Sequence, residues 1–244
     1  MRWLPPRKTP HDLPAECAVT IDSLYPFLSG QRQDPARLDA ALLRAIDVKA
    51  RESRDTAERF FAAQGPALIA AARALALVYS KGGRLFCMGN GGSSCDASHI
   101  TVEFLHPVTA GRPALAAINL TADTATMSAL GNDLGFEHVF ARQIEAQGRA
   151  GDGLIGISTS GNSANLLAAF STAKAMRLTT IGLTGGDGGR MQTCGAVDHC
   201  LVVPTSSIHR IQESHVIAYH VLWDLVHTLL ADQRGSAAAA DGVG

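Results

Sequence analysis

The sequence predicts an α/β fold in which one parallel sheet is covered by helices on both faces. Three observations lead to this expectation. Five short apolar stretches alternate with segments of helical periodicity, which is the pattern of parallel βαβ units. A chain of 244 residues, 46% hydrophobic and 18% charged, can bury a sizeable core. Two of the apolar stretches lead directly into glycine- and serine-rich turns, each of which opens a helix.

The elements are expected in a regular order along the chain. Residues 1–36 predict an N-terminal extension with at most a short helix at 21–28. A single domain then covers 37–232, beginning with two helices separated at 64–66, where the sequence reads Gln-Gly-Pro. Strands are predicted at 84–88, 114–119, 153–158, 179–184 and 199–203, and helices at 93–105, 122–132, 136–147, 162–176 and 208–231. Residues 233–244 are small and weakly patterned, and a disordered tail is expected there.

The overall composition excludes several classes of function. The net charge is −1 with no basic stripe, so nucleic acid is not an expected ligand. We see no apolar run long enough to cross a membrane, and the first residues lack the apolar core of a secretory signal, so we expect a cytoplasmic protein. The five cysteines form no C-x-x-C pair, which argues against a disulfide framework or a structural zinc finger.

A glycine-rich turn follows the first predicted strand. Residues 89–94 read Gly-Asn-Gly-Gly-Ser-Ser and open a helix, so backbone N–H groups and the positive end of the helix dipole point to one place. This arrangement predicts an anion site, which we call the first cradle. A dinucleotide site is the weaker interpretation, because Ser94 stands where a third glycine is needed and the next strand ends at Asn119 rather than at an acidic residue.

A second cradle, residues 158–163, follows the third predicted strand. It reads Ser-Thr-Ser-Gly-Asn-Ser, with four hydroxyls in six residues at the start of a helix, which suits a phosphate monoester. An ordinary helix N-cap is the alternative, but a single hydroxyl would satisfy it. We therefore favour a ligand site.

Two pairs of polar residues are candidates for the chemistry. His99 and Glu103 lie one helical turn apart behind the first cradle. Such a pair can move protons, ligate zinc, or form only a hydrogen bond within the helix. Gln212 and His220 are eight residues apart on the last helix, about 12 Å along its axis. For both to serve one site, different copies of the helix must converge or Gln212 must leave the helix line, so we expect an oligomer. His215, between them, is expected to be packed.

Five motifs in this order identify a known family. They are G-N-G-G-S-x-x-D-A-x-H-x-x-x-E at 89–103, G-N-D-x-G-F at 131–136, I-S-T-S-G-N-S at 157–163, L-T-G-x-D-G-G at 183–189 and R-I-Q-E-x-H-x-x-x-x-H at 210–220. From about residue 40 to 231 the chain resembles the phosphoheptose isomerases of the sugar isomerase (SIS) domain family. The resemblance implies a three-layer, flavodoxin-like SIS fold with N-terminal helices. It also implies an aldose–ketose isomerase that converts sedoheptulose 7-phosphate into D-glycero-D-manno-heptose 7-phosphate through an enediol.

The resemblance further implies a role for each matching position. Glu103 would be the catalytic base and His220 the acid. One Zn²⁺ per subunit would be held by His99, Glu103, Gln212 and His220. The substrate-binding residues would be Asn90, Gly91, Gly92, Ser93, Glu103, Asn132, Asp133, Ser158, Thr159, Ser160, Ser163 and Gln212. The family is a homotetramer whose N-terminal helices help form a central bundle, so we expect a homo-oligomer with sites near subunit interfaces.

Two departures from the family pattern affect the surroundings of the substrate. An arginine that is common shortly after the catalytic glutamate is absent from 104–107, where Arg112 is a possible substitute, and His209 replaces an aspartate before the R-I-Q-E motif. An isomerase of another phosphosugar is therefore one alternative. A non-catalytic regulator that binds the bacterial replication initiator is another. That relative lacks the glutamate and the final histidine, which are both present here.

Overall fold

The computed structural model describes residues 35–109 and 111–241. They divide into two compact units: 35–48 belongs to the first, and the residues from Lys49 onward form the second. The first unit contains the beginning of the long helix α2 (Pro35–Ser80), and its large apolar side chains are exposed. The second contains the sheet and the site. The predicted extension and its short helix at 21–28 lie outside the described residues.

The sheet has five parallel strands in the order β2-β1-β3-β4-β5. The bounds are β1 Leu85–Gly89, β2 Ala117–Asn119, β3 Gly153–Ser158, β4 Thr179–Gly185 and β5 His199–Val203. Strand β3, at the centre, is buried at every position, as expected of a parallel strand with helices on both faces. The predicted parallel α/β fold is confirmed, with the strand order of flavodoxin-like folds.

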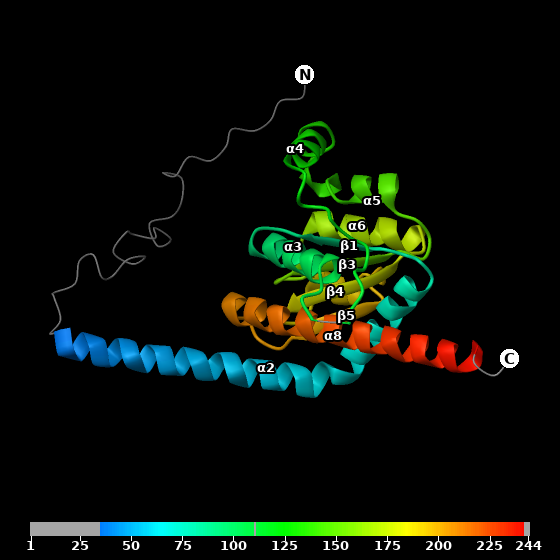
Figure 1. Cartoon of the computed structure of the whole chain (residues 1–244). Coiled ribbons are helices and arrows are strands. Elements are labelled where there is room, and N and C mark those ends of the chain that lie inside the picture. Colours follow the sequence, from blue (N-terminus) through cyan, green and yellow to red (C-terminus); the bar gives the residue numbers. More distant parts are fainter. Residues whose placement is uncertain (1–34, 110, 242–244) are drawn as a thin grey trace, which may run out of the picture. The chain divides into compact units, whose positions relative to one another are not determined.

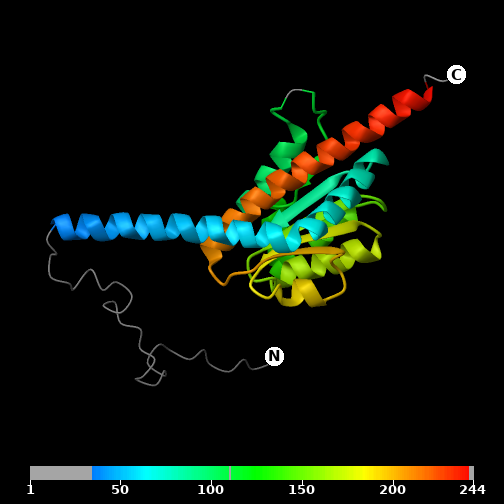
Figure 2. The same ribbon diagram turned by 90° about the horizontal axis from the view of Figure 1, so that it is seen from below.

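Helices cover both faces of the sheet, as Figures 1 and 2 show. They are α3 Gly92–Leu105, α4 Thr124–Asp133, α5 Ala141–Gln147, α6 Ala164–Ala175, α7 Gly189–Thr193 and α8 Ile208–Asp241, with a 3-10 helix, η4, at Phe136–His138. One buried cluster joins α3, α8 and the later part of α2 to the sheet. A second cluster joins α5, α6 and α7 to the sheet from the other side. The result is the three-layer arrangement that was predicted.

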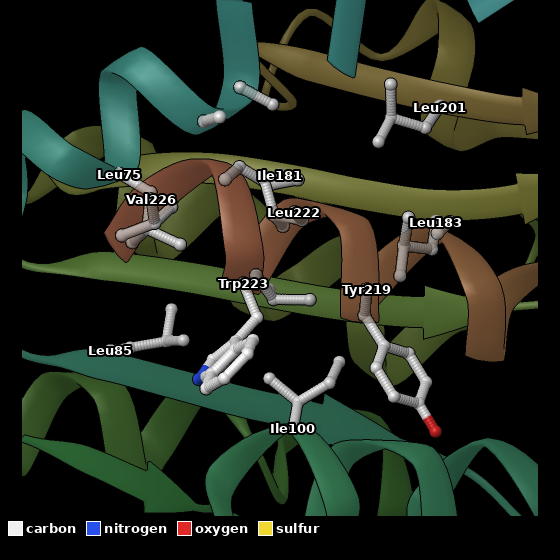
Figure 3. Packing of buried hydrophobic residues seen from close by; sticks show 14 of the residues in the cluster. Leu75, Leu85, Ile100, Ile181, Leu183, Leu201, Tyr219, Leu222, Trp223 and Val226 are labelled. Carbon is white, nitrogen blue, oxygen red and sulfur yellow. The ribbon is translucent and has the colours of Figure 1, made fainter. Parts of the chain in front are cut away.

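The core on the α3 side fixes the two helices that later supply the site. Ile100 of α3 and Leu222 and Trp223 of α8 lie in one buried cluster (Figure 3). On the other face, Phe170 of α6 covers Gly156 of β3 so closely that a Cβ there would lie 2.5 Å from the ring. The missing side chain therefore lets α6 approach the sheet.

Helix α2 differs from the prediction of two separate helices, because it continues through Gly65 and Pro66. A proline removes one helical hydrogen bond and bends a helix, but packing on both sides can keep the helix continuous. Phe60 before the proline and Leu68 after it are buried in the same cluster. The ribbon bends within its cyan part (Figure 1). Tertiary packing therefore overrides the local signal for a break.

Three further boundaries differ from the prediction by more than two residues, and the short helix α7 was not predicted. Strand β2 begins at Ala117 rather than at 114, because the N–H of Leu115 donates to the carbonyl of Phe104 instead of to a strand. The helix expected at 136–147 divides into η4 and α5. Helix α8 continues to Asp241, where disorder was expected from 233, and its alanine-rich end has high helix propensity. Residues 242–244 lie outside the described residues.

Helix α2 also corrects the expectation about apolar runs. Among the described residues, the segment Leu38–Ser80 is long and apolar enough to cross a membrane by length and composition alone, with a mean hydropathy of 1.5 in its most apolar window. Packing gives another reason for part of this character, since 33% of that window is buried. Leu68, Leu75 and Val78 are buried against the sheet. The apolar end of the helix thus serves the core.

Candidate active site

The two cradles lie side by side because the strands before them are neighbours. β1 pairs with β3 from Leu85↔Gly153 to Gly89↔Ile157, so both loops leave the sheet at its carboxyl edge. The sheet is wound in opposite directions from this point, with β2 on one side of β1 and β3, β4 and β5 on the other. In open α/β sheets the crevice at such a switch point is the usual ligand site.

The first cradle needs glycine at two of its positions, 89 and 91; a Cβ at position 89 would lie 2.2 Å from the carbonyl oxygen of Ser93. Gly91 has a φ of +54°, in the region that favours glycine. A Cβ at position 92 would lie 2.4 Å from the amide nitrogen of Gln212. No side chain caps the start of α3, and Ser93 in its first turn is buried. The helix therefore begins without a side-chain cap, and the N–H groups of Ser93 and Ser94 donate to backbone carbonyls of the same turn.

The second cradle is also uncapped, although it is rich in hydroxyls. Ser163 occupies the N-cap of α6 but accepts no hydrogen bond from the helix, and its hydroxyl oxygen lies 2.9 Å from that of Ser158. By contrast, the side chain of Asp123 accepts from two N–H groups at the start of α4. Since the hydroxyls do not cap α6, the ligand interpretation is favoured over the N-cap alternative. Thr159 is half-buried and Ser160 is exposed on the turn between them.

Asn165 joins the two cradles and was not predicted as a site residue. Its side-chain amide forms two hydrogen bonds of 2.9 Å with the amide of Asn90, one in each direction. Asn165 is buried, so loss of either partner would leave polar groups unpaired. The signal in the sequence was an asparagine in the first turn of α6, which an ordinary helix start explains equally well. The pair holds the first cradle to the second.

Three titratable side chains meet behind the first cradle, and we call them the three-residue cluster: His99, Glu103 and His220. His99 Nε2 lies 3.1 Å from Glu103 Oε1, and His220 Nε2 lies 4.0 Å from the same oxygen. One ligand atom from each residue lies within 4.8 Å of the others. The structure therefore brings together the predicted acid and base and three of the four predicted metal ligands.

Helices α3 and α8 run in the same direction in a constant register. The facing pairs are Gly92 with Gln212, His99 with Tyr219 and Glu103 with Trp223, each separated by 120 positions. Gln212 is eight residues before His220, about 12 Å along the axis. In a single chain the amide of Gln212 therefore lies at the first cradle. Gln212 lies by Gly92 at the start of α3, while His220 lies by Glu103 near its end.

Buried neighbours that the sequence analysis did not single out hold the cluster. The Tyr219 hydroxyl lies 2.7 Å from His99 Nδ1, and Trp223 Nε1 donates to the carbonyl oxygen of Glu103 over 2.8 Å. Burial raises the pKa of Tyr219 above its ordinary value, and the carboxylates of Asp96 and Glu103 add to the effect, so the hydroxyl keeps its proton. Burial also raises the pKa of Asp96 to about 6, against the opposing influence of His99.

The three-residue cluster has donor types that divalent metal ions such as zinc bind, and its donor atoms lie within 4.8 Å of one another. Imidazole nitrogens and carboxylate oxygens bind zinc at roughly 2.0–2.2 Å, which places neighbouring ligands of a tetrahedron about 3.3–3.6 Å apart. The distances from Glu103 Oε1 to the two imidazole nitrogens, 3.1 Å and 4.0 Å, lie on either side of that range. Three protein ligands also leave a fourth position for substrate or water, as in catalytic zinc sites.

Two predicted substrate residues lie away from the cluster. Asn132 and Asp133 are exposed at the end of α4, where the Asn132 amide donates to the Asp133 carboxylate over 2.7 Å. Helix α4 packs on the opposite face of the sheet from α3 and α8. A cavity of about 630 Å³ adjoins Asp133, and its other lining residues are Leu134, His138, Ala141, Arg142 and Glu145. A single chain does not bring these two residues to the three-residue cluster.

Arg112 does not take the place of the missing family arginine. Its guanidinium lies 4.3 Å from the centre of the Trp223 ring and forms an ion pair with Asp224. Both contacts tie Arg112 to α8. His209 is exposed at the start of the same helix. Among the residues that the structure describes, Arg112 is therefore engaged with α8.

His215 is packed, as predicted. It is fully buried, and its Nε2 lies 3.1 Å from the carbonyl oxygen of Thr184. Burial lowers the pKa of His215 to about 4, and the hydrogen bond opposes the shift. The imidazole is therefore neutral and donates from Nε2 to the end of β4, next to Ser158 of the second cradle.

A family model and two similar relatives indicate the same protein family. The model of the SIS domain matches residues 50–185. A phosphoheptose isomerase from Desulfovibrio desulfuricans is 43% identical over 198 residues, which cover 80% of this chain and 93% of the relative. A phosphoheptose isomerase from Roseiflexus is 43% identical over 181 residues, which cover 74% of this chain and 91% of the relative.

Solved structures agree with the sequence comparisons. Phosphoheptose isomerase GmhA from Neisseria gonorrhoeae superposes with a TM-score of 0.71 at 36% identity, covering 77% of this chain and 99% of that one. A phosphoheptose isomerase from Francisella tularensis gives a TM-score of 0.72 at 37% identity, covering 76% of this chain and 98% of that one.

Proposed function

Since this chain belongs to the SIS domain family and, within it, to the phosphoheptose isomerases, we propose that it interconverts sedoheptulose 7-phosphate and D-glycero-D-manno-heptose 7-phosphate. One observation of the structure carries the proposal. An acid–base cluster of His99, Glu103 and His220 lies directly behind one of two uncapped cradles at the switch point of the sheet. This arrangement suits a sugar phosphate whose charged end is bound while its other end reacts.

Isomerisation requires a proton to leave the carbon next to the carbonyl and to return to the neighbouring carbon. Glu103 is the base that removes and returns this proton, and the intermediate is an enediol. His220, whose Nε2 lies 4.0 Å from the Glu103 carboxylate, moves the proton between the two oxygens. The hydrogen bond from Trp223 to the Glu103 backbone holds the base in place. One residue thus acts at carbon and the other at oxygen.

The cradles hold the remainder of the substrate. The hydroxyls of Ser158, Thr159, Ser160 and Ser163, with the start of α6, bind the phosphate. Asn90, Gly91, Gly92 and Ser93 bind the sugar, and Gln212 completes this cradle from α8. Binding energy from the phosphate then orients the carbons that react at the cluster.

The three-residue cluster would hold one zinc ion per subunit, and the ion would polarise the carbonyl of the substrate. Support comes from the donor types and the spacing of His99, Glu103 and His220. Gln212 of the same chain lies at the first cradle. The fourth ligand position therefore stays open to substrate, or to a Gln212 from another copy.

We further propose a homotetramer in the cytoplasm. The large apolar side chains in the described part of the first unit are exposed. Four of them, Leu38, Leu42, Leu43 and Ile46, recur at helical spacing on one face, and Val48 lies off that face. Such a face is expected to pack against helices of other copies. Sites near subunit interfaces would also let Asn132 and Asp133 of one copy meet the substrate of another. Light scattering coupled to gel filtration measures the mass directly.

The experiment that tests the function is conversion of sedoheptulose 7-phosphate by the purified protein, with and without added Zn²⁺, followed by proton NMR. Formation of the aldoheptose phosphate supports the proposal. A folded, zinc-loaded protein that leaves the ketose unchanged would contradict it.

A second candidate function is the isomerisation of a different phosphosugar. The observation that favours it is the position of Arg112, which is held by Trp223 and Asp224 on α8 and is not available to replace the family arginine. The same NMR assay with other ketose phosphates distinguishes the candidates. The faster substrate identifies the natural class.

A further inference from the structure

The hydroxyl of Tyr219 forms a hydrogen bond with the imidazole of His99. Tyr219 is almost fully buried, and its ring belongs to the core cluster between the sheet and α8. Figure 3 shows the ring among the core side chains, with its oxygen on the side of the helix that carries Ile100. That oxygen lies 2.7 Å from His99 Nδ1, while the other nitrogen of the ring, Nε2, lies 3.1 Å from Glu103 Oε1. Each nitrogen of His99 thus has its own partner.

The direction of these two hydrogen bonds is coupled through the ring. A neutral imidazole carries one proton, so one nitrogen donates and the other accepts. Without a metal, Nε2–H donates to the Glu103 carboxylate, which can only accept, and Nδ1 accepts from the Tyr219 hydroxyl. When Nε2 ligates a cation, its proton must be on Nδ1, and Tyr219 must then accept. A hydroxyl suits both states because it can donate or accept.

Resting on the metal site of the proposed function, we propose that Tyr219 is a positioning residue that sets the tautomer of His99. Its hydroxyl donates to Nδ1 in the metal-free protein and accepts from Nδ1–H in the metal-bound protein. Hydrogen-bond partners of metal-binding histidines fix the ring and raise its basicity, and their loss typically weakens metal binding 10- to 100-fold. A buried tyrosine ring adds rigidity, since the core prevents the hydroxyl from turning away.

Among the described residues, few other groups lie where they could donate to His99 Nδ1 in one state and accept from it in the other. Asp96 is another titratable group on α3, and it interacts electrostatically with both His99 and Tyr219. An ionised carboxylate accepts only, so it could stabilise the metal-bound tautomer but could not donate in the metal-free one. Glu103 already lies on the Nε2 side of the ring. The tyrosine hydroxyl is the group with the required chemistry at Nδ1.

The test compares Tyr219→Phe with Tyr79→Phe. Both substitutions remove one hydroxyl and keep the ring, and the Tyr79 hydroxyl donates to the backbone carbonyl of Ala116, away from the cluster. Zinc affinity is measured by competition with a chromophoric chelator. We expect a 10- to 100-fold loss for Tyr219→Phe and no change for Tyr79→Phe. Equal affinity in the two variants would overturn the role of Tyr219 while leaving the metal site intact. A wild-type protein that binds no zinc would overturn the metal site itself.

A second measurement needs no substitution and therefore does not depend on how the variants fold. Protein labelled with ¹⁵N in histidine is titrated with Zn²⁺, and long-range proton–nitrogen spectra report which nitrogen of His99 carries the proton. We expect the proton on Nε2 before zinc and on Nδ1 after it, and a hydroxyl resonance of Tyr219 that shifts at the same point. A proton on Nδ1 in both states would show that the hydroxyl does not change its direction, and would overturn the proposal.

Discussion

The two cradles resemble each other in construction but differ in what lies behind them. Each follows a central strand, turns at a glycine with positive φ and opens a helix without a side-chain cap. Behind the second cradle, α6 buries Leu166, Ala169 and Phe170 in the core. Behind the first, α3 turns His99 and Glu103 toward α8. The comparison indicates that binding is shared between two similar loops, while the chemistry depends on one helix pair.

The largest effect is expected from Glu103→Gln, which removes the base but keeps the size of the side chain. General-base catalysis contributes typically 10²–10⁴-fold, so kcat should fall by about that factor. Substrate affinity should fall less than kcat, because both cradles are intact, although Glu103 is itself one of the proposed substrate-binding and zinc-binding residues. Steady-state kinetics and calorimetry measure the two quantities. Glu145→Gln, at an exposed ion pair with Arg142 on α5, is the control and should retain full activity. A Glu103→Gln variant with near-normal kcat would show that the chemistry does not depend on Glu103 behind the first cradle.

Gly161→Ala should disrupt the second cradle through the backbone. Gly161 has a φ of +65°, and a Cβ there would lie 2.1 Å from the carbonyl oxygen of Gly188. Gly195→Ala is the matched control, since its φ is +71° but the space around it is open. Left-handed backbone alone costs about 1–2 kcal/mol. We expect Gly161→Ala to lower the free energy of unfolding by at least about 2 kcal/mol more than the control, measured by urea denaturation. Equal losses in the two variants would show that the second cradle tolerates the clash.

Ser158→Ala should weaken binding without changing the chemical step. A hydrogen bond to a charged group contributes about 1.5–3 kcal/mol, which corresponds to a roughly 10- to 100-fold rise in KM. Since this bond is made equally in the ground and transition states, kcat should change little. Ser128→Ala on α4, where the hydroxyl donates to the Ala125 carbonyl, is the control. A fall in kcat alone would place Ser158 among the reacting groups and erase the distinction between the cradles.

The smallest effect is expected in the pH dependence of the free energy of unfolding, through His215, which is buried next to the second cradle. The pKa of His215 is lowered to about 4 in the folded protein, against an ordinary value of 6.5. The stabilising contribution of the neutral imidazole is therefore complete above pH 6.5 and is lost as the pH falls toward 4. At pH 5.5 the loss should be about 1 kcal/mol. Thermal melting from pH 7.5 to 4.5 measures it, and His215→Asn should flatten the dependence. Identical slopes in both proteins would exclude His215 as the cause.

The fold could be predicted from the sequence where local pattern and packing agree. β3 and β5 occur at the predicted residues, because short apolar runs between turn signals have the length typical of strands. The break at 64–66 was wrong, because residues on both sides of Pro66 are buried in one core. The start of β2 was wrong because one backbone hydrogen bond to α3 removes Leu115 from the sheet. Such long-range contacts have no local signal.

Long-range contacts also limited how much of the site could be predicted from the sequence. His99 and Glu103 could be found because one helical turn links them in the sequence. Their meeting with His220 depends on the register of α3 against α8, which packing sets. Tyr219 and Asn165 were missed for this reason, since each acts through a partner far away in the chain. Sequence motifs therefore identify the catalytic residues more readily than they identify the residues that position them.

The central claim is that the cradles bind the substrate and that Glu103 performs the proton transfer. The most direct test is solvent exchange in deuterated water, with sedoheptulose 7-phosphate bound to wild type and to Glu103→Gln at measured, similar affinity. We expect deuterium at the carbon next to the carbonyl with wild type and none with the variant. Deuterium incorporation by Glu103→Gln at the wild-type rate would show that another group is the base.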